Sequence, residues 1–289
     1  MAGEATKALS NDVLWGGGRS PFSISYGKMM MWFFLVSDAL TFSGLLVAYG
    51  FARHATTDSW PIGEEVFRAL PFIHGDFPLI YVALMTAILI FSSVTMVLAV
   101  EAGHRMDKKG VIKWLFLTVI GGAFFVGSQA WEWSHFIHGG GGYITTADGS
   151  KYWVHNDDHD THDPANAAGF HLVKAKPGHY LIPAEGDHAH VEGAEAQALW
   201  NDRVAYIDGA NMTRNEYGPP QYASFEFIIS GFHGFHVLSG LVNAVIVLLM
   251  VMRGVFHRRG HYEMVEKAGL YWHFVDLVWV FVFTFFYLL

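Results

Sequence analysis

Five long apolar runs divide the chain, and polar segments separate them. The runs are Met29–Phe51, Pro78–Val100, Lys113–Ile137, Phe225–Met252 and Ala268–Leu289. Each run exceeds the ~20 residues that a helix needs to cross a hydrocarbon core, and none shows the polar face of a soluble amphipathic helix. In lipid, backbone polar groups must be bonded within their own segment, so the runs predict five transmembrane helices.

The predicted fold is an all-α integral membrane bundle with a large extramembrane insert between the third and fourth helices. We expect an N-terminal tail (1–28), helices one to three (29–137), the insert (138–221) and helices four and five (222–289). The insert is rich in Gly, Asp and His. Short apolar pieces within it leave two alternatives open, an ordered cap or a free loop.

The orientation follows from the basic residues. Lys and Arg gather in the tail and in the loops 101–113 and 253–267. Five alternating spans place these segments on one side of the membrane, which the positive-inside tendency makes the cytoplasmic side. We therefore expect a multi-pass protein of the bacterial inner membrane, with a cytoplasmic N-terminus and a periplasmic insert and C-terminus.

Composition narrows the chemistry. The chain has no cysteine, which excludes disulfides, thiol catalysis and Cys-ligated metal centres. The formal net charge is -8 and no basic patch is present, so nucleic acid is not an expected partner. Metal binding would have to use histidine and carboxylate ligands.

Four motifs are specific. They read YGKMMMWFFLVSDALTFSGLLVAYGFARH (Tyr26–His54), GSQAWEW (Gly127–Trp133), SGFHGFHVLSG (Ser230–Gly240) and GLYWHFVDLVWVFVF (Gly269–Phe283). In this order they resemble subunit III of the heme–copper cytochrome c and quinol oxidases, in its five-helix bacterial form. Two departures stand out: Ser37–Asp38 replaces the family's usual Ser-Glu pair, and the insert is far longer than the usual connection.

The resemblance implies an accessory subunit of a respiratory terminal oxidase that reduces oxygen to water and pumps protons. Heme and copper would lie in partner subunits, and this chain would hold no catalytic residue and no redox centre. The expected partners are oxidase subunits I and II and membrane phospholipid. Cytochrome c or another respiratory complex is a further candidate, since the acidic insert could attract a basic protein.

Ionisable residues inside the helices are the candidate functional groups, because charge in a bilayer costs at least ~2.5–3.5 kcal/mol unless protein or water shelters it. For Asp38 two interpretations stay open, a structural hydrogen-bonded acid and a proton-related site. Helical spacing predicts a buried polar network of imidazoles and acids. The expected members are Asp38, Glu132, Glu226, His233, His236, His273 and Asp276.

Two other classes of function compete with the oxidase subunit. A heme-b-binding anchor of a quinol-linked oxidoreductase would need two facing histidines, such as His233 or His236 with His273. A proton-coupled transporter would also place acids within helices, but the chain shows neither the internal repeat nor the broken helices that are typical of transporters.

Two further sets of residues are candidate ligand sites. The resemblance implies that a cleft between the first two helices and the other three holds phospholipid, with Arg253, His257, Arg258, Trp60 and His74 as candidate contacts. In the insert, His155, His159 and His162 are candidate zinc or copper ligands. Because they lack a fixed spacing signature, the favoured interpretation of that stretch is a solvated acidic loop without metal.

Overall fold

The computed structural model describes residues 24–56, 60–71, 79–139, 142–155, 164–166, 169–174 and 190–289. The chain divides into two compact units. The first comprises Met1–Val47, Ile80–Gln129 and Ile229–Tyr287, and the second comprises Ala48–Leu79, Ala130–Ile228 and Leu288–Leu289. Three of the long helices contribute to both units.

Among the described residues, five helices are long and apolar enough to cross a membrane, which confirms the predicted five-helix bundle. They are α2 (Tyr26–Ala55), α4 (Ile80–His104), α5 (Lys108–His138), α7 (Pro220–Met252) and α9 (Glu263–Val282), which the π-helical turn η3 (Phe283–Leu288) continues. Most of them extend beyond their apolar runs because polar end residues remain helical at the membrane interface.

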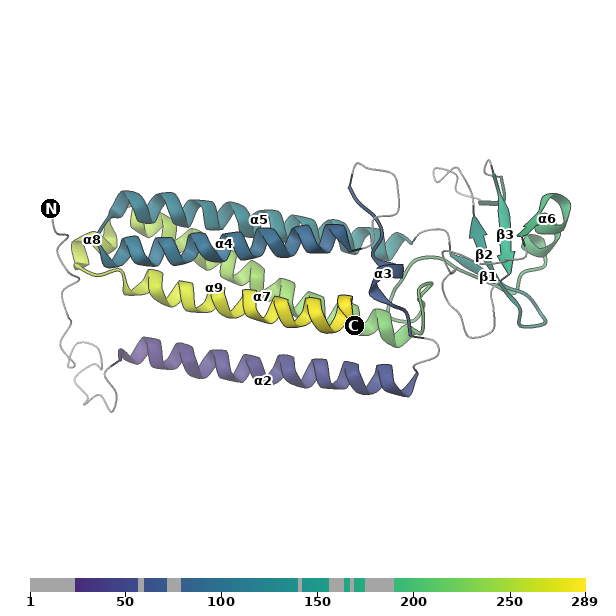
Figure 1. Cartoon of the computed structure of the whole chain (residues 1–289), viewed down its shortest axis with the longest axis horizontal. Helices are drawn as coiled ribbons and strands as arrows, with labels where there is room; N and C mark the ends of the chain where they lie inside the picture. Colours follow the sequence, from purple (N-terminus) through teal and green to yellow (C-terminus); the bar gives the residue numbers. More distant parts are fainter. Residues whose placement is uncertain are drawn as a thin grey trace. The chain divides into compact units, whose positions relative to one another are not determined.

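In the first unit, α4 and α9 pack side by side (Figure 1). Small residues allow this approach: Ala99 and Ala102 are fully buried, and a Cβ on Gly269 would lie 3.0 Å from Val100 Cγ2. The lipid cleft expected between the first two helices and the other three stays a prediction, and the α4–α9 contact lies across the boundary expected for it.

Helix α2 is the least covered of the five helices. Only 11% of its most apolar window is buried, and Phe33 and Leu40 are 62% and 70% exposed. Within the first unit, its contacts with α7 and α9 are made by a few side chains. At its start, Lys28 Nζ lies 2.5 Å from Glu266 Oε1, and Ser25 hydrogen-bonds Glu263.

The connection between α7 and α9 is a short helix, α8 (Val255–Arg259), flanked by two left-handed glycines. Gly254 has φ 71° and Gly260 has φ 77°, a region that favours glycine because it has no Cβ. Gly254 separates α7 from α8, and Gly260 ends α8. The exposed side chains of His257, Arg258 and Arg259 therefore gather on one short segment.

The second unit contains an antiparallel sheet that the all-α expectation did not include. Its strand order is β4-β3-β2-β1-β5. The strands are β1 (Tyr143–Thr145), β2 (Lys151–His155), β3 (His171–Lys174), β4 (His190–Glu192) and β5 (Ala205–Ile207). Strands of three to five residues are too short to give a clear alternating pattern in the sequence.

Helix α6 (Gly193–Asn201) closes one face of this sheet. Its Ala196 and Trp200 are buried in one cluster with Ile144, Val154 and Leu172 of the strands. The insert thus has its own apolar core, which agrees with the ordered cap rather than the free loop. The short helix α3 (Gly63–Val66) and the 3-10 turn η2 (Pro164–Asn166) belong to the same unit.

We expect Trp200→Ala to destabilise the insert by about 3–5 kcal/mol, because it removes the largest side chain from this core. Trp200 is only 5% exposed. Limited proteolysis of the full chain in detergent would measure the loss as faster cleavage within residues 139–221. Met212→Ala is the matched control, since Met212 is 59% exposed. Equal cleavage rates for the two variants would contradict the assigned core.

Glycines join the end of α5 to the insert within the second unit. Gly209 has φ 65°, and a Cβ there would lie 2.0 Å from the Ile137 carbonyl oxygen. The Gly209 N–H donates to the buried carboxylate of Glu216 at 2.7 Å. A Cβ on Gly139 would also collide with this carboxylate, so the junction requires glycine at both positions.

Candidate functional site

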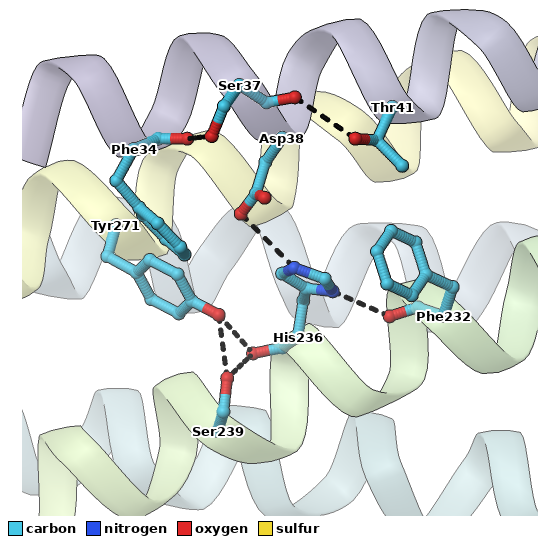
Figure 2. Close-up of polar contacts among 8 residues, drawn as sticks. All are labelled: Phe34, Ser37, Asp38, Thr41, Phe232, His236, Ser239 and Tyr271. Carbon is cyan, nitrogen blue, oxygen red and sulfur yellow. Dashed lines mark hydrogen bonds and ion pairs between the residues drawn. The ribbon is translucent and has the colours of Figure 1, made fainter.

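Asp38 of α2 and His236 of α7 form a hydrogen-bonded acid–imidazole pair inside the first unit. His236 Nε2 lies 3.2 Å from Asp38 Oδ2, and the two side chains are 8% and 15% exposed respectively. Asp38 is twelve residues into a helix of 30, so it lies about 18 Å along the axis from the start. The pair therefore connects α2 to α7 deep within the membrane-spanning part (Figure 2).

The hydrogen bonds of His236 determine the proton count of the pair. Nδ1 lies 2.8 Å from the Phe232 carbonyl oxygen, and a carbonyl can only accept, so Nδ1 must carry a hydrogen. The contact between Nε2 and Asp38 then needs one further proton, on the nitrogen or on the oxygen. Either arrangement has zero net charge, because an imidazolium faces a carboxylate or a neutral imidazole faces a carboxylic acid.

Tyr271 of α9 and Ser239 of α7 extend this polar group. The Tyr271 hydroxyl lies 2.6 Å from Ser239 Oγ and donates to the His236 carbonyl oxygen at 3.1 Å. Phe34 of α2 stacks near the Tyr271 ring at 6.1 Å between centroids. Side chains from three helices thus lie around the pair. The two hydroxyl groups bond the His236 carbonyl oxygen, and the rings of Phe34 and Tyr271 stack beside them.

Ser37 does not take part in the pair, although it precedes Asp38 in the motif. Its hydroxyl donates to the Phe34 carbonyl oxygen at 2.7 Å, within its own helix, and the residue is exposed. Thr41 in the same way donates to the Ser37 carbonyl oxygen. These local bonds satisfy both hydroxyls on the surface of α2 (Figure 2).

His233 lies one turn from His236 but in a different environment. It is fully buried, and its Nε2–H donates to the Val275 carbonyl oxygen of α9 at 3.1 Å. The rings of Phe125 and Trp279 contact the imidazole at 5.8 Å and 5.0 Å between centroids. This histidine therefore links α7 to α9 inside an aromatic core.

A second polar group connects α4 to α9. Ser93 Oγ lies 2.7 Å from His273 Nδ1 and also hydrogen-bonds the Asp276 carboxylate. The sequence spacing placed His273 and Asp276 one turn apart, and the structure adds the bridging hydroxyl. Ser93 is buried, so its hydroxyl gives the His273 ring a partner away from water, whereas Asp276 Oδ1 has no hydrogen-bond partner among the described residues.

Glu132 and Glu226 belong to the second unit and are almost fully buried. Both carboxylates interact electrostatically with Tyr222, which lies on the same helix as Glu226. Tyr49 of α2 hydrogen-bonds Arg53 and accepts a hydrogen bond from the Trp60 indole at 3.3 Å. The structure thus assigns these acids to a different unit from Asp38, and the single network expected from the sequence stays a prediction.

The expected lipid contacts are distributed over both units. Arg253, His257 and Arg258 are exposed where α7 passes into α8. Trp60 is instead buried between the rings of Tyr49 and Tyr222, and His74 lies outside the described residues. Phospholipid binding by these five residues stays a prediction.

Of the three metal-ligand candidates in the insert, the structure describes only His155. His159 and His162 lie outside the described residues. Within the described part of the chain, no three histidines or acids converge on one point where an ion would sit. Partial burial of the His155 ring lowers its pKa, and the neighbouring His171 and His190 lower it further.

Sequence reasoning missed the residues that complete these groups. It named Asp38 and His236 but did not pair them, and it omitted Tyr271, Ser239 and Ser93. The sequence could have indicated these hydroxyl-bearing residues, because polar residues within spans of this kind face protein rather than lipid. No comparable pattern in the sequence indicates which residues pair between two helices that are far apart in the chain.

The known proteins that resemble this chain are described as subunit III or subunit 3 of an oxidase. The family model described as cytochrome c oxidase subunit III matches residues 213–289. A cytochrome c oxidase subunit 3 of Corynebacterium diphtheriae is 28% identical over 263 residues, covering 90% of this chain and 85% of that protein. The cytochrome bo(3) ubiquinol oxidase subunit 3 of Pseudomonas aeruginosa is 24% identical over 258 residues, covering 89% and 82%.

By these matches the chain is similar to subunit III of the heme–copper oxidases. A probable cytochrome c oxidase subunit 3 of Nocardia farcinica, 23% identical over 267 residues, covers 91% of this chain and 87% of its own length. This similarity agrees with the motifs on α2, α5, α7 and α9. Those on α2 and α7 contain Asp38 and His236, and the motif on α9 contains His273 and Asp276, whose partner Ser93 lies on α4.

Proposed function

We propose that this chain is the non-catalytic subunit III of a terminal oxidase and that its Asp38–His236 pair supports proton uptake by the catalytic subunit. The similarity to subunit 3 proteins of cytochrome c and quinol oxidases supports an accessory subunit of a heme–copper oxidase complex. The observation that supports the role of the pair is an acid–imidazole pair buried between α2 and α7 in a membrane protein. Such groups are expensive in a bilayer and are commonly functional.

The proposed chemistry is proton buffering. With Nδ1 fixed as a donor to Phe232, the pair without its shared proton would have a carboxylate facing a nitrogen lone pair and a net charge of -1. Taking up one proton restores the hydrogen bond and neutrality in a region of low dielectric constant. The pair could therefore accept and return a proton while Tyr271 and Ser239 hold the local backbone in place.

The proposed partners are oxidase subunits I and II. Their proposed contact is the apolar face of α2 on which Phe33 and Leu40 are exposed. The positive-inside tendency supports a cytoplasmic N-terminus and a periplasmic insert and C-terminus. The relatives named above are bacterial proteins, in agreement with an inner-membrane location.

No observation favours the two competing classes of function. His233, His236 and His273 each use a ring nitrogen for a protein hydrogen bond, to Val275, to Phe232 and Asp38, and to Ser93 respectively. Iron ligation through Nε2 of His233 or His236 would have to break the bond to Val275 or to Asp38. A transporter would need broken helices, and the five spans in the described residues are continuous.

Co-purification tests the proposed function. A tagged chain extracted in mild detergent should carry the oxidase core with it, and the complex should reduce oxygen. The chain purified alone should show no stoichiometric Soret band. A Soret band in the isolated chain, or the absence of an oxidase core from the purified material, would contradict the proposal.

Phospholipid binding at the α7–α8 turn gives a separate prediction. Arg253 and Arg258 are exposed there, and a Cβ on Gly254 would lie 3.6 Å from Lys108 Nζ, so a third cation is close. We expect the double variant Arg253→Ala, Arg258→Ala to retain less phospholipid, since about 1 kcal/mol of attraction is lost per basic residue. Phosphorus analysis of the purified complex measures this loss.

Arg105→Ala is the matched control for this prediction. Arg105 is exposed and pairs with Glu101 where α4 ends, so removing it does not change the α7–α8 turn. If the double variant and the control retain the same amount of phospholipid as wild type, the basic turn serves only to anchor the helix ends.

A further inference from the structure

Three histidines and one glutamate share one face of three neighbouring strands in the insert. His155 of β2 is the register partner of His171 of β3, and His171 is the partner of Glu192 of β4. Directly opposed residues on antiparallel strands point to the same face. His190 precedes Glu192 by two residues and so shares that face as well.

The imidazole rings of these residues are close to each other. The ring centroids of His155 and His171 are 5.1 Å apart with the planes at 11°, and those of His171 and His190 are 5.3 Å apart at 34°. His155 and His190 are exposed and His171 is half-buried. A metal ion from solution can therefore reach the ring nitrogens on this face of the sheet.

One of the three rings is already oriented by a backbone group. His171 Nδ1 lies 2.9 Å from the Gly169 carbonyl oxygen, so Nδ1 carries the hydrogen and Nε2 carries the lone pair when the ring is neutral. A bond from the other ring nitrogen to a carbonyl is the usual support of a metal-binding histidine. The Glu192 side chain does not cap α6, although Glu192 is the residue that precedes this helix.

We propose that His155, His171, His190 and Glu192 bind a divalent transition-metal ion such as Zn²⁺. Imidazole suits zinc, copper and nickel, whereas calcium and magnesium prefer oxygen ligands. As the side chains now lie, the rings stack and their nitrogens do not converge on one point among the described residues. Binding would therefore have to turn the rings about their side-chain bonds until the nitrogens lie ~2.0–2.1 Å from one ion. The set differs from the histidines that the sequence suggested, since three of its four members come from β3 and β4.

The sheet holds these four residues in fixed positions on one face, where they can bind one ion. The face opposite the histidines is closed by α6 through Trp200 and Ala196, so the strands that carry the ligands are held by an apolar core. An ion bound across β2, β3 and β4 would link three strands that the sequence connects through long segments. The site is independent of the proposed function, because it involves no residue of the membrane-spanning helices.

Equilibrium dialysis of the full chain in detergent against Zn²⁺ at pH 7.5, with zinc measured by mass spectrometry, tests the proposal. We expect about one zinc ion per chain, bound by histidine nitrogens that X-ray absorption at the zinc edge would detect. His171→Ala should weaken binding at least ~10-fold, the range seen when one supporting group is lost from a metal site. His257→Ala is the control, because His257 is exposed on α8 and should leave zinc binding unchanged.

Two further measurements distinguish zinc bound at this site from zinc bound elsewhere on the chain. Lowering the pH from 7.5 to 5.5 should release the zinc from the unmodified chain reversibly, because protons compete for imidazole. If the triple variant His155→Ala, His171→Ala, His190→Ala binds zinc as wild type does, the ion is held elsewhere and the proposal is wrong. Absence of stoichiometric zinc from the wild-type chain, or absorption spectra with only oxygen neighbours, would also overturn it.

Discussion

Replacing Asp38 with alanine should leave the oxidase assembled but slow its proton uptake or shorten its active lifetime. The substitution removes a charge-assisted hydrogen bond between α2 and α7, which stabilises by about 1.5–3 kcal/mol. The remaining His236 can stay neutral, so no uncompensated charge is left in the membrane. Proton uptake by the purified complex in vesicles, its turnover rate and its inactivation half-time are the measurements.

The reverse substitution should be more severe. His236→Ala leaves the Asp38 carboxyl without its partner at a site where the carboxylate is only 15% exposed. Removing one member of a buried pair commonly costs about 3–5 kcal/mol, so loosening of α2 is expected in detergent. A double-mutant cycle of the two substitutions would give the coupling energy of the pair.

Ser37→Ala is the control for both variants. Ser37 neighbours Asp38 in sequence, but its hydroxyl bonds only within α2 and faces outward. It should match wild type in assembly and in proton uptake. If Asp38→Ala also matches wild type in turnover, lifetime and proton uptake, the pair has a structural role alone.

Gly122→Ala should destabilise the helix bundle by about 1–3 kcal/mol. A Cβ at this position would lie 2.5 Å from the Cη2 atom of Trp272 and 3.2 Å from Leu241. Trp272 cannot easily move, because it is 1% exposed and its indole N–H donates to Ser92 Oγ at 3.1 Å. Thermal unfolding in detergent would measure the effect as a lower midpoint.

Gly127→Ala offers a matched control five residues further along α5. No atom lies within 4 Å of the position that its Cβ would occupy. Alanine favours a helix over glycine by about 0.8–1.0 kcal/mol, and both substitutions gain this term. The difference between the two variants therefore isolates the steric contact with Trp272. Equal midpoints would show that α5 and α9 do not pack as described.

Much of the membrane part could be predicted from the sequence. The five spans follow from length and hydropathy alone, because lipid permits few structures for an apolar segment of ~20 residues. Polar positions such as Asp38 and His236 were also recognisable as candidates. Their pairing was not, since spacing along one helix carries no information on which residue of another helix lies opposite.

The insert was much harder to predict. Its strands are three to five residues long, so the alternation of apolar residues has too few repeats to indicate a sheet. The row of His155, His171 and Glu192 arises only from the strand register. Sequence proximity instead favoured His159 and His162, which lie outside the described residues.

The long separation between Asp38 and His236 has a consequence for biosynthesis. The two residues lie 198 positions apart in the chain. At ~5–20 residues per second, a ribosome needs roughly 10–40 s to make the partner after Asp38 has left it. The first span must therefore wait in the translocon or the bilayer with its acid protonated or shielded by other molecules, and it can attach through His236 only after most of the protein has been translated.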